Sequence, residues 1–198
     1  MHATILPYFG TMVGMKLNAK QLRSYTRKHD DSQTSKLENK LPRNEIYIVL
    51  DNVLDTYNVG SIFRLADAVS AKKVYLCGET EIPPNPRIKK ASINTTEWVE
   101  WEYCETAVEA VSRVKGEAER VKIVAVEQST KSVQYDKFEY ELPICLIVGN
   151  ETNGVSKEVL DVSDAIVELP MFGVNKSLNV MVSLGIVLYR VIEDTGFA

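Results

Sequence analysis

The sequence predicts an α/β fold in which a mostly parallel sheet is covered by helices on both faces. From residue 45 onward, short apolar runs alternate with segments whose apolar residues recur at helical spacing. Continuous apolar runs are typical of buried parallel strands, and the intervening helices connect one strand to the next. A chain of 198 residues, 45% hydrophobic and 25% charged, suits one domain over residues 45–198 after an extension over residues 1–44.

The predicted elements follow one another in a regular order. The first strand covers residues 45–50 (EIYIVL), and an amphipathic helix over residues 59–70 follows it. The other strands are short apolar runs at residues 73–77, 98–103, 122–126, 144–148 and 165–169. The other helices are expected at residues 105–118, 156–161 and 178–192. Residues 81–90 (EIPPNPRIKK) are expected to form a loop, because proline interrupts regular structure.

The last predicted helix is apolar around its whole circumference. Its apolar residues are Leu178, Val180, Met181, Val182, Leu184, Ile186, Val187, Leu188, Val191 and Ile192. A helix that is apolar on every side must be buried on every side, and a small domain covers the outer face of a terminal helix poorly. We therefore expect a homodimer to which this helix contributes. Packing of the helix wholly inside one subunit is the alternative.

Three loops share one design, in which small and polar residues follow a strand and lead into a helix. They are NVGSIFR at residues 58–64, GNETNG at residues 149–154 and PMFGVNKSLNV at residues 170–180. Open α/β sheets bind ligands at the carboxyl ends of their strands. We therefore expect the three loops to form one composite site.

Each loop contains a polar residue with two interpretations. Arg64 holds a phosphate or forms a surface ion pair. Glu151 has a functional role or caps the helix that follows it. Ser177 caps the last helix, a role that does not exclude catalysis.

Charge is distributed unevenly along the chain. Residues 15–44 contain eight basic and three acidic side chains, a local charge of +5, although the whole chain carries −4. This extension is expected to form a short helix and a linker, and its basic residues include Lys20, Arg23, Arg27 and Lys28. Such a segment is typical of contact with nucleic acid, and a solvated tail is the alternative.

Composition argues against several kinds of site. The only two histidines, His2 and His29, lie near the amino end, and the three cysteines lack CxxC spacing. We therefore expect no metal site and no catalytic histidine pair, and the cysteines are expected to be reduced core thiols. Neither GxGxxG after the first strand nor GxxxxGK[ST] occurs, which argues against dinucleotide dehydrogenases and P-loop enzymes. With no signal peptide and no uninterrupted apolar stretch of about 18 residues, a cytoplasmic protein without membrane contact is expected.

The three loops resemble, in order and spacing, the three motifs of the SpoU/TrmH branch of the SPOUT RNA methyltransferases. The motifs are NVGSIFR, VGNETNGVS and LPMFGVNKSLNV, and the resemblance covers about residues 45–193. It implies an α/β sheet whose carboxyl-terminal part threads through a loop as a deep trefoil knot, a feature that general rules of topology would reject. It also implies an obligate dimer that methylates a ribose 2′-hydroxyl in tRNA or rRNA. S-adenosylmethionine is the implied cofactor, S-adenosylhomocysteine is the implied product, and no metal is implied.

The resemblance assigns site residues position by position. Asn58 and Arg64 match the catalytic pair of the first motif, with Arg64 near the reacting ribose of the RNA. Glu151 matches the acidic residue of the second motif. Ser177 and Asn179 match the polar pair of the third motif. The residues that match cofactor-binding positions are Gly149, Leu169, Met171 and Leu178.

The chemistry of arginine limits its role in such a reaction. A guanidinium group is a poor proton acceptor, because its pKa lies above about 12. We therefore expect Arg64 to hold a phosphate or to lower the pKa of the hydroxyl electrostatically, with the proton lost to a neighbour or to water. Methylation of a base is one alternative function, and RNA binding or cofactor sensing without catalysis is the other. The 44 residues before the first strand are too few for a separate RNA-binding domain, which favours tRNA over rRNA as the substrate.

Overall fold

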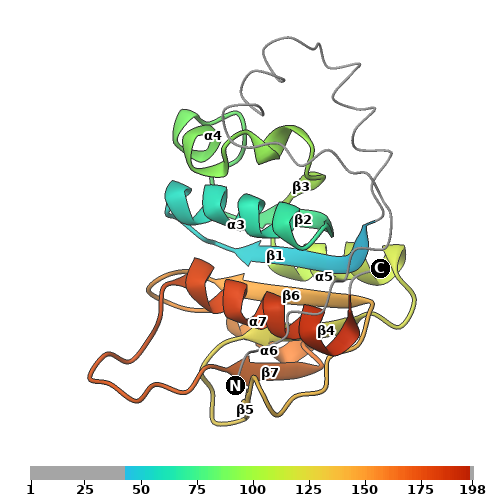
Figure 1. Ribbon diagram of the computed structural model, residues 1–198, viewed down its shortest axis with the longest axis vertical. Helices are drawn as coiled ribbons and strands as arrows, with labels where there is room; N and C mark the ends of the chain where they lie inside the picture. Colours follow the sequence, from blue (N-terminus) through green and yellow to red (C-terminus); the bar gives the residue numbers. More distant parts are fainter. Residues whose placement is uncertain (1–42, 197–198) are drawn as a thin grey trace, which may run out of the picture.

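A seven-stranded parallel sheet forms the centre of the protein in the computed structural model, which describes residues 43–196. The strand order is β3-β2-β1-β6-β4-β7-β5, and Figure 1 shows β1 and β6 side by side in the middle of the sheet. Every neighbouring pair of strands is parallel. The strands are β1 (Asn44–Asp51), β2 (Ala71–Cys77), β3 (Trp101–Cys104), β4 (Lys122–Val126), β5 (Val133–Gln134), β6 (Ile144–Gly149) and β7 (Ala165–Glu168).

Helices cover both faces of the sheet, as predicted. The helices are α3 (Thr56–Ala68), α4 (Pro86–Ser92), the 3₁₀ turn η1 (Thr95–Glu97), α5 (Ala107–Glu117), α6 (Lys157–Val162) and α7 (Val180–Thr195). Ile46, Ile48 and Leu50 of β1 pack into one core with α3, α4 and α7. Tyr47 and Val49 point to the other face, into a core with α5 and α6. Successive side chains of β1 thus alternate between two apolar cores. Figure 1 shows α3 and α7 lying next to each other over the first face.

The main correction to the predicted elements concerns residues 81–90. The second half of this segment is helical, since α4 begins at Pro86. The side-chain oxygen of Asn85 accepts hydrogen bonds from the backbone N–H of Arg87 and Ile88, which caps the helix. Proline at the first position of a helix loses no hydrogen bond that the helix would have made, so Pro86 starts α4 and does not interrupt it.

Smaller differences lie elsewhere in the sheet and in its thiols. The two-residue strand β5 was expected to be part of a polar connection, and β3 begins at Trp101, three residues later than expected. Cys77, Cys104 and Cys145 are buried and free, as predicted. Burial raises the pKa of the Cys145 thiol, which keeps it protonated. None of the helices within residues 43–196 combines the length and the apolar character needed to cross a membrane.

Candidate active site

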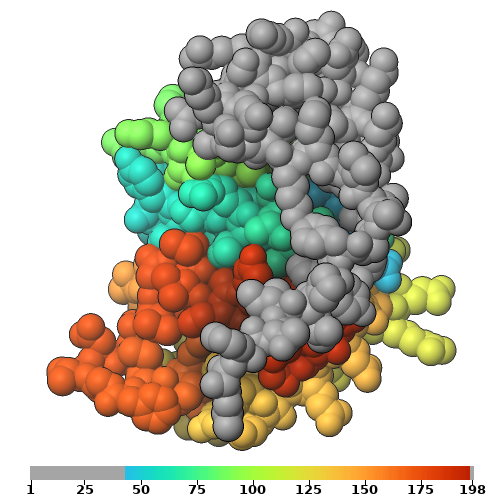
Figure 2. Space-filling view, in the orientation of Figure 1, coloured from blue at the N-terminus to red at the C-terminus, as the bar shows by residue number. Residues whose placement is uncertain are grey.

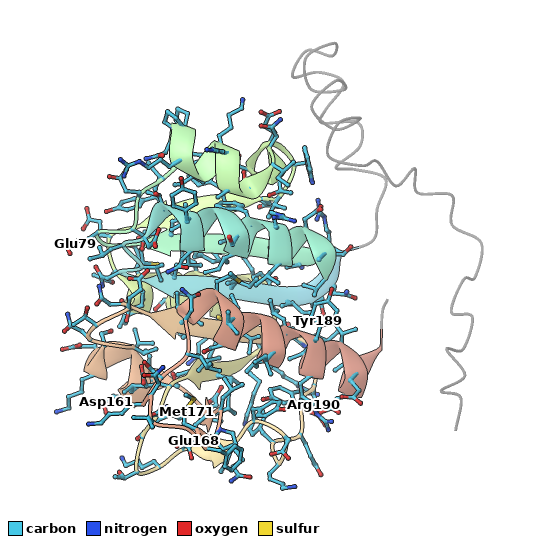
Figure 3. The ribbon with its side chains drawn as sticks, turned by 60° about the vertical axis from the view of Figure 1, so that its left-hand side comes forward. Glu79, Asp161, Glu168, Met171, Tyr189 and Arg190 are labelled. Carbon is cyan, nitrogen blue, oxygen red and sulfur yellow. The ribbon has the colours of Figure 1, made fainter. Side chains whose placement is uncertain are left out.

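The second and third loops enclose a cavity of about 440 Å³ at the carboxyl ends of β4, β6 and β7. Apolar and polar side chains share its lining, with Met171 and Glu168, both labelled in Figure 3, among them. Its other lining residues include Val126, Glu127, Gln128, Gly149, Glu151, Leu169, Lys176, Ser177, Leu178, Asn179 and Ser183. The volume lies in the range of small-molecule sites, at the sheet edge where such sites are expected.

The loop after β6 is a tight hairpin. A Cβ atom on Gly149 would lie 2.2 Å from the carbonyl carbon of Gly154, so only glycine fits there. Asn150 and Gly154 exchange two backbone hydrogen bonds, of 3.1 and 2.9 Å. The side-chain oxygen of Asn150 also accepts from the backbone N–H of Thr152 and Asn153. These contacts fix the loop and so hold Glu151 in place.

Glu151 binds the start of α3, not the helix that follows it. Its carboxylate accepts from the backbone N–H of Leu54 and Asp55, both at 3.1 Å, and from Nδ2 of Asn58 at 2.9 Å. The following helix, α6, begins after Ser156, so the alternative that Glu151 caps it is wrong. Partial burial raises the pKa of Glu151, but the hydrogen bonds from Asn58, Leu54 and Asp55 outweigh burial and lower it. Glu151 is therefore ionised at neutral pH.

Asn58 joins the first and third loops. It is 5% exposed, and its Oδ1 accepts a hydrogen bond of 3.0 Å from Nδ2 of Asn179. The Oδ1 of Asn179 in turn accepts from the backbone N–H of Met181 and caps α7. The prediction that Ser177 caps this helix is therefore wrong, because the helix begins two residues later than that role requires. Ser177 instead lines the cavity with an exposed side chain.

The four residues assigned to cofactor binding lie around this same cavity. Gly149 and Leu169 stand at the ends of β6 and β7, and Met171 and Leu178 belong to the loop before α7. The structure thus brings together every assigned catalytic and cofactor-binding residue except Arg64. Lys20, Arg23, Arg27 and Lys28 lie outside the described residues.

Arg64 is not among the residues that line the cavity. It lies on α3 six residues after Asn58, which is about 600° of rotation, so the two side chains leave the helix in different directions. Arg64 is exposed and makes no hydrogen bond or ion pair with any residue of the described part of the chain. The role of Arg64 near the reacting ribose therefore stays a prediction.

Two site residues were missed by the sequence analysis. Glu127 follows β4, and its Oε2 accepts from the backbone N–H of Val155 at 2.8 Å. The neighbouring Gln128 donates from Nε2 to the carbonyl oxygen of Lys176 at 2.7 Å. The pair therefore ties the second loop and the third loop to the end of one strand. The sequence could have indicated both residues, because a polar pair directly after the apolar run 122–126 repeats the design of the three loops.

The profile of the SpoU rRNA methylase family matches residues 45–189, most of the chain. The chain belongs to the SpoU methylase family. The matched range contains all three loops, the whole of the second core and all of the first core except Val191 and Ile192. The prediction of the family is therefore confirmed.

Relatives and solved structures of this family agree with that assignment. The tRNA (guanosine(18)-2'-O)-methyltransferase of Aquifex aeolicus is 33% identical over 152 residues, which cover 74% of this chain and 68% of that protein. The enzyme of the same name from Escherichia coli is 29% identical, and 62% of its length is covered.

Two crystal structures match the fold. The A. aeolicus TrmH/SpoU tRNA modifying enzyme has a TM-score of 0.71 at 28% identity, over 83% of each chain. An AdoMet-bound rRNA methyltransferase from Sinorhizobium meliloti has a TM-score of 0.69 at 30% identity, over 79% of this chain and 59% of that one. The SpoU-family fold predicted for this chain, a parallel sheet with helices on both faces, is thus confirmed.

Proposed function

We propose that this SpoU-family protein is an S-adenosylmethionine-dependent methyltransferase that acts on a ribose 2′-hydroxyl of RNA. The observation that carries the proposal is the meeting of three distant loops at one cavity through the hydrogen bonds of Glu151, Asn58 and Asn179. The names of the A. aeolicus and E. coli relatives support a ribose 2′-hydroxyl as the target.

The cavity suits the cofactor that the family implies. The side chains of Leu169, Met171 and Leu178 offer apolar contacts for an adenosine group, beside the backbone of Gly149. Three carboxylates, those of Glu127, Glu151 and Glu168, also line the cavity and favour a positively charged ligand. When bound there, S-adenosylmethionine supplies an electrophilic methyl group, and S-adenosylhomocysteine is the product. Within residues 43–196, no group of three or more His, Cys, Asp or Glu side chains is placed to hold a metal ion.

The polar residues of the site have separate roles in binding the RNA and in fixing the loops. Ser177 lines the cavity, and its hydroxyl makes no hydrogen bond within the described part of the chain, so it is available to the ribose hydroxyl. Asn58 and Asn179 fix the third loop against the first, and ionised Glu151 fixes the second. Arg64 holds an RNA phosphate or lowers the pKa of the hydroxyl, and the proton leaves to a neighbour or to water.

In the homodimer that we propose, Arg64 of each subunit approaches the cavity of the other subunit. The outward face of α7 exposes Val182 and Tyr189 by 40% and 54%, and the neighbouring α3 exposes Tyr57 by 52%. Arg64 belongs to the same outward face of α3. A second copy that covers this apolar face brings each Arg64 toward the partner's cavity, whose wall includes the first turn of α7.

We also propose a trefoil knot and tRNA as the substrate. Contact between Gln128, which follows β4, and Lys176, which precedes α7, supports a carboxyl-terminal segment that passes through the connection after β4 as a trefoil knot. tRNA is favoured over rRNA as the substrate, with the basic residues of segment 15–44 as RNA contacts and the cytoplasm as the place of action.

Product analysis tests the proposal. The protein is incubated with methyl-labelled S-adenosylmethionine and unfractionated tRNA, or with rRNA, and the RNA is digested and analysed by mass. The expected product is a 2′-O-methylated nucleoside, and Asn179→Ala is expected to abolish it. Glu79→Gln, at an exposed position away from the cavity, serves as the control and keeps activity. Label on a base, or no label in either RNA, contradicts the proposal.

A further inference from the structure

The tip of the loop between β7 and α7 exposes apolar side chains that nothing in the described chain covers. Phe172 is 93% exposed and Val174 is fully exposed. A Cβ atom built on Gly173, between them, meets no atom within 4 Å. Figures 1 and 2 show this segment projecting from the body, beside β7. Full exposure of a phenylalanine is unfavourable in water, so this side chain is available to a partner.

The base of the same loop is held firmly. Gln128 donates to the carbonyl oxygen of Lys176, and Asn179 caps α7 and donates to Asn58. Met171 and Lys176, on the two sides of the tip, both line the cavity. The tip therefore stands at the edge of the cavity, and these hydrogen bonds fix its carboxyl-terminal side.

Charge in the loop favours a polyanionic partner. Lys176 is the only charged residue in segment 170–178, and its ammonium group makes no ion pair within residues 43–196. An exposed aromatic ring next to a free cation is the combination with which proteins bind single-stranded nucleic acid. The ring stacks on a base and the cation meets a phosphate.

We propose that Phe172 stacks on an unpaired base of the RNA substrate, at the nucleotide whose ribose enters the cavity or at its neighbour. The inference rests on the proposed function, because it takes RNA as the substrate. A ribose that reaches the cavity carries its base to the cavity edge, and Phe172 is an aromatic side chain at that edge. Lys176 then contacts the phosphate beside that nucleotide.

Binding of two RNA probes by the full chain tests the inference. The first is a fluorescein-labelled single-stranded RNA of about ten nucleotides, and the second has the same backbone without bases. Phe172→Ala is expected to weaken binding of the first probe about five- to 150-fold, because a base stacked on an aromatic ring contributes this much. Binding of the abasic probe is expected to stay unchanged. Phe172→Trp retains affinity for the first probe, whereas Phe172→Leu, apolar but not aromatic, behaves like Phe172→Ala.

The matched control is Tyr103→Ala. Tyr103 is 43% exposed and lies on β3, at the opposite edge of the sheet from β7 and β5, so its removal is expected to leave binding of both probes unchanged. Equal weakening of both probes by Phe172→Ala, or wild-type binding by Phe172→Leu, overturns stacking.

Two further outcomes would assign the loop to another partner. Dissociation of the dimer by Phe172→Ala, measured by light scattering, means that a second copy covers Phe172. Weaker binding of S-adenosylmethionine by this variant, measured by calorimetry, means that Phe172 closes over the cavity. Either result overturns the inference. A wild-type protein that binds the probes but methylates no RNA contradicts the proposed function. The binding test of Phe172 remains valid in that case, because it does not depend on methylation.

Discussion

At the scale of single residues, Glu151 connects segments that are far apart in the sequence. Its partners Leu54, Asp55 and Asn58 lie more than ninety positions before it. A carboxylate that accepts several N–H groups is stabilised in its charged form, which explains its lowered pKa. The charge of Glu151 is therefore part of what holds the first loop against the second.

The first prediction concerns Glu151→Gln and its dependence on pH. Because the folded state depresses the pKa of Glu151 below its ordinary value of 4.5, its charge stabilises the fold above that pH. This contribution is lost as pH falls through the folded-state pKa. The variant is expected to be less stable by on the order of 1 kcal/mol from pH 6 to 8, after allowance for solvent screening. The difference is expected to shrink below about pH 4.

Urea unfolding at several pH values measures this difference. Glu79→Gln, at an exposed position, is the control and is expected to match the wild type at every pH. A stability loss for Glu151→Gln that is unchanged at low pH would mean that shape, and not charge, is what the loop requires.

Sequence reasoning reached only part of the site at this scale. The rule that strand ends meet at one edge of a parallel sheet predicted that the three loops converge. The direction of Arg64 was not predicted, because it depends on how α3 is rotated about its axis. Glu127 and Gln128 were missed because neither belongs to a recognised motif, although both make contacts that tie the loops together.

At the scale of elements, α3 and α4 pack so closely that only glycine fits at position 60 of α3. A Cβ atom on Gly60 would lie 2.6 Å from Cβ of Ala91 and 2.7 Å from the carbonyl oxygen of Ile88. The contact explains why α4 packs so closely on α3. Its buried Ile88 packs on α3 at a site that only glycine leaves open. Apolar runs in the sequence predicted the long strands. The contact between α3 and α4 could not be predicted in this way, because it depends on residues that are distant in the sequence.

The second prediction tests that contact with Gly60→Ala. Overpacking against backbone atoms is expected to destabilise the protein by about 1–3 kcal/mol, even though alanine favours helix more than glycine does. Gly116→Ala in α5 is the matched control, because a Cβ atom there meets no atom within 4 Å. It is expected to leave stability unchanged or raise it by up to about 1 kcal/mol. Thermal and urea unfolding measure both, and equal effects would refute the close contact.

Edge strand β3 is held by a buried cation. Lys73 on β2 is 8% exposed, and its ammonium group lies 2.7 Å from Glu102 and 2.9 Å from Glu117. Burial lowers the pKa of Lys73, but the hydrogen bonds that its ammonium group makes to Glu117 and Tyr75 outweigh burial and raise the pKa. Lys73 is therefore charged in the folded protein and joins β2 to both β3 and α5.

The third prediction is that Lys73→Met destabilises the protein by about 2–4 kcal/mol at neutral pH, because neighbouring carboxylates lose their common partner. Lys72→Met is the control. Within residues 43–196, Lys72 makes one ion pair, at 3.4 Å, with Glu45, and its loss is expected to cost less than about 1 kcal/mol. Urea unfolding at pH 7 compares the two. A Lys73→Met protein as stable as Lys72→Met would show that the cluster contributes little.

At the scale of the whole molecule, the sequence analysis predicted a knot and a homodimer. The knot came only from resemblance to a family, since topology leaves no periodic signal in a sequence. The homodimer was expected first from the apolar circumference of the last predicted helix, and the resemblance implies it as well. Within one subunit, the apolar outer face of α7 and the outward direction of Arg64 both lack a partner among the described residues. One arrangement, a second copy on that face, accounts for both.

The fourth prediction follows from that arrangement, in which Arg64 serves the partner's site. Arg64→Ala and Ser177→Ala are each expected to be inactive as homodimers. A heterodimer of the two retains one site with both residues, Ser177 from one subunit and Arg64 from the other. Heterodimers purified through two different tags are therefore expected to recover about half of wild-type methylation per dimer.

Heterodimers of Asn58→Ala and Ser177→Ala are the control. They are expected to stay inactive, because Asn58 bonds to Glu151 and Asn179 of its own subunit. Recovery by neither pair would place Arg64 in its own subunit's site, and recovery by both would mean that the two subunits exchange whole loops.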